Sequence, residues 1–184
     1  MSTNREKRPK WDFVKDVAGV LVVIGALFLA FAPESVWQSG SVTPAGERKA
    51  GGSFTMTNLD GNLWKLDQQR GKVVLVNYWA TWCPPCRVET PGLVRLANEY
   101  QSRGVEIVGV SLDEDAGAIR PFIDDYKIPY PILLPADKSN LSLMIEALPT
   151  TLLYDRQGRL AKRYTGAVSE SIFRADVESL LKEQ

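Results

Sequence analysis

The chain has 184 residues, enough for one domain of ordinary size with an additional segment. Its 22 lysines and arginines balance its 22 aspartates and glutamates, so the charge pattern of a nucleic-acid binder is missing and we expect no nucleic-acid partner. The chain contains no histidine, which excludes Ser-His-Asp and Cys-His catalysis and every metal site that needs an imidazole ligand.

The first predicted element is an apolar run at residues 17–32, which as a helix of about 16 residues would be about 24 Å long. Basic residues precede the run, and Trp11 and Trp37 bracket it where interfacial aromatic residues lie in membrane proteins. This pattern is typical of a helix that crosses a membrane with its N-terminus inside the cell. We therefore expect a cytoplasmic basic tail at residues 1–15 and a transmembrane signal anchor at residues 16–33.

Two alternatives to an anchor remain for this segment. The first is a cleaved signal peptide, because "AFA" at residues 30–32 has the small-x-small form of a cleavage site. Pro33, directly after this pattern, disfavours cleavage. The second alternative is a buried core helix, for which the basic flank and the terminal position would be accidental.

The next segment, residues 34–52, is rich in Gly, Ser and Pro and lacks an apolar period, which predicts a flexible linker. The folded domain is then expected at residues 53–184. With the N-terminus in the cytoplasm, this domain lies on the periplasmic side of the cell membrane, attached by a single pass. Disulfides persist there, and a thiol pair needs a supply of electrons to stay reduced.

The sequence of the domain predicts strands that alternate with helices. The predicted elements are a β-hairpin at residues 54–66 turned at Asp60 and Gly61, a buried strand at 72–80, a helix through 93–100 that ends by Gly104, a buried strand at 105–112, a helix through 119–126, a strand at 132–134, a helical stretch near 141–147, a hairpin at 150–164 turned at Gln157 and Gly158, and a final helix through 173–181. Pro121 leaves the start of the 119–126 helix open. This order predicts an α/β fold with a mixed central sheet covered by helices on both faces.

The only cysteines of the chain, Cys83 and Cys86, follow the buried strand at residues 72–80 in the stretch "YWATWCPPCR". Ligand chemistry in sheets of this kind is found at the C-terminal ends of parallel strands, where this position places them. If Cys83 caps the following helix, its sulfur faces unpaired N–H groups and the positive end of the helix dipole, and both favour the thiolate. Cys86, one turn into the helix, is then the buried resolving thiol.

The residues around the cysteines limit how far the thiolate is favoured. Pro84 and Pro85 fit the first helical positions, but they remove two possible N–H donors to the Cys83 sulfur. Cys86 and Arg87 supply the next N–H groups, and the positive charge of Arg87 adds to the local field. We therefore expect a thiolate that is stabilised modestly.

A metal site and a permanent disulfide are the alternatives to a redox pair. Two thiolates, with no histidine and no second cysteine pair, cannot complete a tetrahedral zinc site. Closing so small a ring removes little entropy from the unfolded chain, so a permanent disulfide would stabilise the fold very little. The spacing therefore favours a pair that forms and breaks a disulfide in each turnover.

Three features together resemble the thioredoxin superfamily: "WATWCPPC" after a buried strand, Pro91 five residues after the second cysteine, and "LPT" at residues 148–150 before a hairpin strand. The resemblance covers most of residues 53–184. It is similar in particular to the membrane-anchored TlpA/ResA group of thiol-disulfide oxidoreductases, which act outside the cytoplasm and commonly keep cysteines reduced for cytochrome c or oxidase assembly. It implies a thioredoxin-like fold, a cis peptide bond before Pro149, and substrate docking beside the backbone of Leu148.

Further site residues follow from the same resemblance. Asn77 stands where thioredoxins themselves carry a buried acid, although a buried Asn could simply satisfy backbone groups. Members of the TlpA/ResA group carry a glutamate linked to active-site acidity at the position of Glu89; a solvated carboxylate on the helix face is the alternative. Trp79 is expected in the core. The predicted substrate-binding residues are Trp82, Pro84, Leu148 and Pro149.

The sequence therefore predicts a membrane-tethered protein disulfide reductase. The Cys83 thiolate attacks a substrate disulfide, Cys86 resolves the mixed disulfide, and Glu89 is the third expected catalytic residue. No cofactor is expected beyond the cysteine pair, and the expected partners are a disulfide-containing protein and an integral membrane electron donor. The alternatives are a dithiol oxidase, a peroxiredoxin-like peroxidase and a non-catalytic assembly adaptor.

Overall fold

The structure, a computed structural model, describes residues 41–135 and 145–183. The expected cytoplasmic tail, the expected transmembrane anchor and the first part of the expected linker fall on residues 1–40, outside the described residues. Among the described residues, no helix combines the length and the apolar character that crossing a membrane requires.

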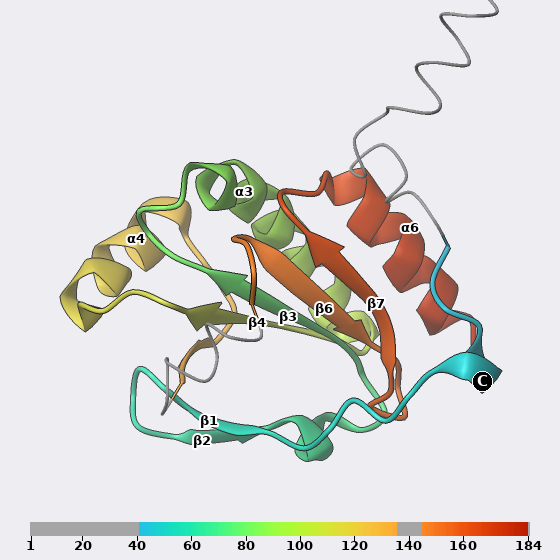
Figure 1. Cartoon of the computed structure of the whole chain (residues 1–184). Coiled ribbons are helices and arrows are strands. Elements are labelled where there is room, and N and C mark those ends of the chain that lie inside the picture. The colour runs from blue at the N-terminus through green and yellow to red at the C-terminus, as the bar shows by residue number, and fades with distance from the viewer. Residues whose placement is uncertain (1–40, 136–144, 184) are drawn as a thin grey trace, which may run out of the picture. The chain divides into compact units, whose positions relative to one another are not determined.

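A seven-stranded mixed sheet forms the centre of the domain, with strand order β2-β1-β5-β4-β3-β6-β7 (Figure 1). Strands β3, β4 and β5 run parallel to one another, and the remaining pairs are antiparallel. The mixed sheet and the N-terminal hairpin agree with the prediction. The strands are β1 (Thr55–Asn58), β2 (Leu63–Lys65), β3 (Val73–Trp79), β4 (Val105–Ser111), β5 (Ile132–Leu134), β6 (Thr150–Tyr154) and β7 (Leu160–Thr165).

The described helices are short 3-10 turns and three α-helices. The 3-10 helices are η1 (Ala45–Glu47), η2 (Leu66–Gln69), η3 (Gln101–Arg103) and η4 (Ala116–Ala118); the α-helices are α3 (Pro84–Tyr100), α4 (Ile119–Tyr126) and α6 (Glu170–Leu181). Helix α3 is followed by η3, which ends at Gly104 with a φ of 83°, a left-handed conformation that glycine adopts easily. Pro121 is the third residue of α4, where its missing N–H breaks no helical hydrogen bond.

Every residue of β3 is buried, because both faces of this strand are covered. Val73 and Leu75 point to the face on which α3 and α6 pack, and Trp79, further along the same face, packs against Phe122 of α4. Figure 1 shows α3, α4 and α6 together on one side of the sheet. The near-continuous apolar run in the sequence thus forms a central strand, as predicted.

The N-terminal hairpin and the turn after it cover the described part of the opposite face. Val74 packs there in one cluster with Trp64 and Leu66, which belong to the N-terminal hairpin and the turn after it. The described α-helices all lie on the other face, and helices on both faces stay a prediction. The helical stretch expected near residues 141–147 falls mostly outside the described residues.

The N-terminal boundary of the domain is also corrected. The sequence places the start near Ser53, but the compact unit begins at Ser41. The Thr43 N–H donates to the Ala161 carbonyl at 2.9 Å, and Ala50 forms an isolated β-bridge with Arg159. The flexible-linker prediction is thus wrong for residues 41–52, which run beside the C-terminal hairpin.

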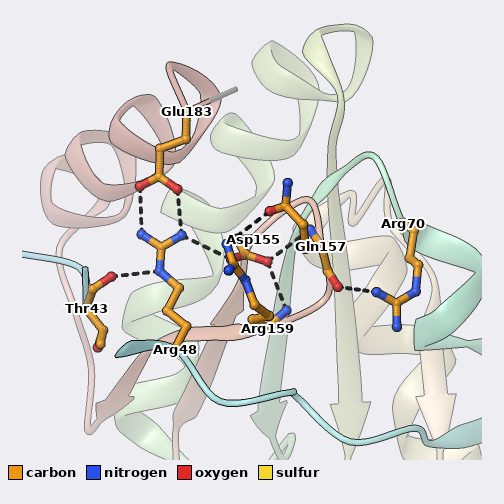
Figure 2. A network of polar contacts seen from close by, with 7 residues as sticks. All are labelled: Thr43, Arg48, Arg70, Asp155, Gln157, Arg159 and Glu183. Atoms are coloured by element: carbon orange, nitrogen blue, oxygen red, sulfur yellow. Dashed lines mark hydrogen bonds and ion pairs between the residues drawn. The ribbon is translucent and has the colours of Figure 1, made fainter. Parts of the chain in front are cut away.

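Arg48 holds this segment in place (Figure 2). Its guanidinium donates to Asp155 Oδ2 at 3.1 Å and to both carboxylate oxygens of Glu183 at 2.6 Å, while its Nε donates to the Thr43 carbonyl at 2.7 Å. The Arg48 side chain is 1% exposed, so the pair with Asp155 is shielded from water. Arg48 therefore joins the N-terminal segment, the β6–β7 turn and the end of the chain.

The β6–β7 turn has its own internal support. Asp155 Oδ1 accepts hydrogen bonds from the N–H groups of Gln157 and Arg159, both at 2.9 Å, and Gly158 has a φ of 72°. An aspartate that caps the following backbone and a glycine with positive φ are typical of tight turns. The predicted turn at Gln157 and Gly158 is confirmed, and Arg70 reaches across to the Gln157 carbonyl (Figure 2).

Candidate active site

The two cysteines lie where β3 ends and α3 begins. Cys83 is the N-cap of α3, with φ −87° and ψ 108°, and its sulfur accepts a hydrogen bond from the Cys86 N–H at 3.2 Å. Pro84 and Pro85 occupy the first two helical positions, where a missing N–H costs little. The local geometry is the one predicted from the sequence, because a strand end followed by two prolines leaves the Cys83 side chain at the cap.

Cys83 and Cys86 form a disulfide. The exposed fractions of the two residues are 3% and 2%, so burial does not distinguish them in this oxidised state. The position of Cys83 at the helix N-terminus is what favours it as the attacking sulfur once the pair is reduced. The division of roles between the two sulfurs stays a prediction.

The loop before β6 packs against the same cluster as the two cysteines. Its Leu148–Pro149 peptide bond is cis, as the resemblance implied. The half-buried Leu148 side chain packs against the cluster that contains both cysteines, and the Pro149 carbonyl accepts from the Gly166 N–H at 2.8 Å. The structure thus brings residues that are far apart in sequence to the same place.

Exposed apolar side chains flank the buried disulfide. Trp82 is 67% exposed and directly precedes Cys83, Pro84 is exposed directly after it, and Val88 is 77% exposed in α3. Trp79, by contrast, is 2% exposed and lies over Gly109, where an added Cβ would be only 2.7 Å from the indole nitrogen. Trp79 is a core residue, as expected.

Glu89 is buried on α3, one turn after Cys86. It is 5% exposed; its Oε1 accepts from the Val168 N–H at 2.8 Å and its Oε2 accepts from Asn77 Nδ2 at 2.9 Å. Burial raises the pKa of Glu89 to about 7, against the two hydrogen bonds, which lower it. The alternative of a solvated carboxylate on the helix face is therefore wrong.

Asn77 connects Glu89 to β6, the strand that follows the cis proline. Its Nδ2 donates to Thr151 Oγ1 at 2.9 Å as well as to Glu89, and Thr151 lies two residues after Pro149. Asn77 therefore does more than satisfy backbone groups. Thr151 and Val168 were not predicted as site residues, since nothing local in the sequence indicates that they reach Glu89.

The loop between β3 and Cys83 is held by two further charged residues. Asp113, buried after β4, accepts hydrogen bonds from the backbone and the hydroxyl of Thr81. The guanidinium of Arg87 donates to the Thr81 carbonyl at 3.0 Å and lies 5.4 Å from the ring centre of Phe122. Asp113 was also missed, although a polar residue shortly after a parallel strand is a signal that could have found it.

The arrangement offers a cysteine pair and no evident metal ligands. Within residues 41–135 and 145–183, no three His, Cys, Asp or Glu side chains are grouped so that they could hold a metal ion. The arrangement suits disulfide exchange. The sulfur that caps the helix is bonded to a second sulfur one turn into the helix, and apolar side chains are exposed beside them.

Comparison with known proteins agrees with this site. Residues 48–176 match the AhpC/TSA family. The thiol-disulfide oxidoreductase ResA of Halalkalibacterium halodurans is 30% identical over 180 residues, which cover 97% of this chain and 99% of that protein. The thiol-disulfide oxidoreductase ResA of Bacillus subtilis is 34% identical over 131 residues, covering 71% of this chain and 73% of that protein.

A solved structure gives the same result for the fold. The crystal structure of a thiol:disulfide interchange protein of the thioredoxin family from Chlorobium tepidum superposes with a TM-score of 0.66 at 26% identity, covering 76% of this chain and 99% of that one. The predicted thioredoxin-like fold is confirmed. The chain belongs to the AhpC/TSA family and, within its thioredoxin-like fold, to the ResA-like thiol-disulfide oxidoreductases.

Proposed function

We propose that this protein reduces disulfides of other proteins outside the cytoplasm. The observation that supports this most directly is the disulfide between the N-cap residue Cys83 and Cys86, flanked by the exposed Trp82. An exposed aromatic side chain beside a cysteine pair suits contact with a polypeptide surface. The substrate is therefore a protein with an accessible disulfide.

The reaction begins with the reduced pair. The Cys83 thiolate attacks one sulfur of the substrate disulfide, forming a mixed disulfide and releasing the other substrate sulfur as a thiolate. Cys86, deprotonated, then attacks Cys83 Sγ, which forms the Cys83–Cys86 disulfide and releases the second substrate sulfur. Two electrons pass from the protein to the substrate, and the two substrate thiolates take up protons.

The surroundings of Cys83 favour reduction over oxidation as the direction. A dithiol is strongly oxidising only when its thiolate form is strongly stabilised. Here Pro84 and Pro85 offer no N–H to the Cys83 sulfur, which accepts a hydrogen bond from the Cys86 N–H. The buried Glu89 carboxylate, one turn after Cys86, adds negative charge when it is ionised. We expect a reduction potential below roughly −200 mV, on the reducing side of the thioredoxin-like scale.

The predicted membrane anchor at residues 16–33 would hold this domain at the outer side of the cell membrane, with residues 1–15 inside. Turnover needs a two-electron donor that re-reduces the Cys83–Cys86 disulfide, and an integral membrane protein is the expected donor outside the cytoplasm. The resemblance to the TlpA/ResA group makes cytochrome c or oxidase assembly the expected process.

A trapping experiment tests the proposal. Cys86→Ser should attack a disulfide-bonded protein substrate and stop as a covalent complex, whereas Cys83→Ser should form no such complex and show no reduction. The reverse pattern would exchange the roles of the two sulfurs. Equilibration of the purified protein with glutathione buffers tests the direction, and a potential near the −120 mV of DsbA would replace the reductase by an oxidase.

The same variants separate the other candidates. A peroxidase would consume hydrogen peroxide, and only one of its cysteines would react with the peroxide. Cys86→Ser would therefore lower the rate of peroxide consumption less than the rate of disulfide reduction. A non-catalytic adaptor would bind its partner equally well with both cysteines replaced, and the wild-type protein would not reduce insulin catalytically. Either result would contradict the proposed function.

A further inference from the structure

Asp113 is the second residue after β4 and is only 3% exposed. Both of its carboxylate oxygens accept from the Thr81 N–H, at 3.1 and 3.0 Å, and Oδ1 also accepts from the Thr81 hydroxyl at 2.6 Å. Its Oδ2 accepts from the Ser111 hydroxyl at 2.8 Å, and the same Ser111 oxygen accepts from the Asp113 N–H. A buried carboxylate with this set of donors is firmly fixed.

Thr81 is the middle of the short connection from β3 to the disulfide. While its N–H is bound by Asp113, its carbonyl accepts from Arg87, so its peptide groups are held on both sides. The Cys83 N–H donates to the Ala80 carbonyl at 3.2 Å and closes a tight turn around Thr81. The position of Cys83 at the helix cap therefore depends on a turn that Asp113 fastens to the end of β4.

The carboxylate also places a negative charge near the backbone of the attacking cysteine. The chain from the Thr81 N to the Cys83 N spans two residues, at most about 7 Å, so the Asp113 oxygens lie within about 10 Å of the Cys83 backbone. A buried charge at this distance is poorly screened by salt. Because a like charge disfavours the ionised form, the Asp113 carboxylate opposes the Cys83 thiolate.

Other ionisable or charged side chains pack against the cluster that contains the cysteine pair or lie beside the pair on α3. They include Arg87 and Glu89 on α3, Tyr126 on α4 and Tyr130 in the connection that follows it. Arg87 favours the thiolate, whereas the buried Glu89 opposes it when ionised. The test therefore has to change the charge of Asp113 and leave these groups in place.

We propose that Asp113 is a positioning residue of disulfide exchange, which fastens the turn before Cys83 and, through its charge, makes the cysteine pair more reducing. This proposal rests on the proposed function, disulfide exchange. The acidity of the Cys83 thiol and the reduction potential of the cysteine pair are nevertheless measured without a partner protein. Removing the negative charge should stabilise the thiolate, and a more stable thiolate makes the dithiol a weaker reductant.

The test compares Asp113→Asn with Glu114→Gln in the otherwise unchanged full-length protein. Glu114 is the next residue and is exposed, so it serves as a matched charge control. In Asp113→Asn, the pH midpoint of Cys83 alkylation should fall by about half a unit to one unit. The equilibrium constant with glutathione should change three- to tenfold towards the dithiol, or roughly 15 to 30 mV. Glu114→Gln should match the wild type in both measurements.

A folded Asp113→Asn variant with an unchanged alkylation midpoint and an unchanged potential would overturn the proposal, even if its melting temperature fell, because a purely structural role predicts that combination. A midpoint that rises would overturn it as well. If Asp113→Asn does not fold, Asp113→Ser removes the same charge from a smaller side chain and is read in the same way. An oxidising potential in the wild-type protein would refute the reductase function and leave this comparison valid.

Discussion

Asn77 and Glu89 share a buried hydrogen bond of 2.9 Å between Asn77 Nδ2 and Glu89 Oε2. The second carboxyl oxygen of Glu89 accepts from the Val168 N–H, so both oxygens face donors, as suits an ionised carboxylate. Burial favours the neutral acid, and the balance puts the pKa of Glu89 at about 7. Since the Thr151 hydroxyl can accept or donate, the Asn77 amide can turn over and serve the protonated acid too.

Glu89→Gln should make stability less dependent on pH. A carboxyl whose pKa rises from 4.5 unfolded to about 7 folded stabilises the native state below pH 4.5, and this contribution is lost as the pH rises to 7. The loss amounts to at most about 3 kcal/mol. The free energy of unfolding of oxidised Glu89→Gln, from urea titrations at pH 4.5, 6 and 7.5, should therefore fall less across this range than that of the wild type.

The exposed Glu114→Gln variant is the control for that series, and its pH dependence should follow the wild type. Parallel curves for the wild type and Glu89→Gln would show that Glu89 titrates at an ordinary pKa in the folded protein. Such curves would contradict the conclusion that burial raises the pKa of Glu89.

The acidity of the attacking thiol should also respond to Glu89. Above pH 7 the Glu89 carboxylate carries a negative charge one turn from Cys86, and this charge opposes a nearby thiolate. Glu89→Gln should therefore lower the pKa of the Cys83 thiol, measured as the pH dependence of alkylation of the reduced protein. An unchanged alkylation midpoint would mean that Glu89 does not act on the cysteine pair.

Arg48→Ala should destabilise the domain by about 3 kcal/mol, because it leaves the buried Asp155 without one of its partners and removes the link to Glu183. Chemical denaturation measures the loss. Arg120→Ala is the matched control, since Arg120 and Asp60 are both exposed and such a pair contributes less than about 1 kcal/mol. Equal effects of the two substitutions would contradict an integral role for residues 41–52.

The predicted orientation can be read with a fusion after Gln184. A reporter that is active only in the cytoplasm should stay silent there, because the basic residues before residue 17 keep the N-terminus inside. The protein should also fractionate with membranes. Reporter activity would reverse the orientation, and a soluble mature protein would favour cleavage after Ala32.

The sequence determined the local features of the site. The apolar run of β3, the two prolines and the two cysteines predicted a strand end followed by a helix with Cys83 at its cap, because these depend on neighbours along the chain. The parallel order of β3 and β4 followed from the alternation of strand and helix. Trp79 could be assigned to the core for the same local reason.

Only the tertiary structure shows which face of the sheet the helices α3 and α4 cover. The connections from β3 through α3 to β4, and from β4 through α4 to β5, move in the same direction across the sheet. Right-handed crossovers in one direction place their helices on one face. The alternation of elements does not contain this strand order, so it could not show that α3 and α4 lie together.

The environment of single polar residues was likewise decided only in three dimensions. Residues 41–52 lack an apolar period, yet Arg48 is buried because Asp155 and Glu183, more than a hundred positions away, surround it. Glu89 could equally have been solvated, and its burial depends on Val168, 79 positions away. The hydrophobic periodicity of a sequence predicts which residues are buried. The partner of a buried charge is determined by packing between segments that are distant in the sequence, and it can be identified only in the folded structure.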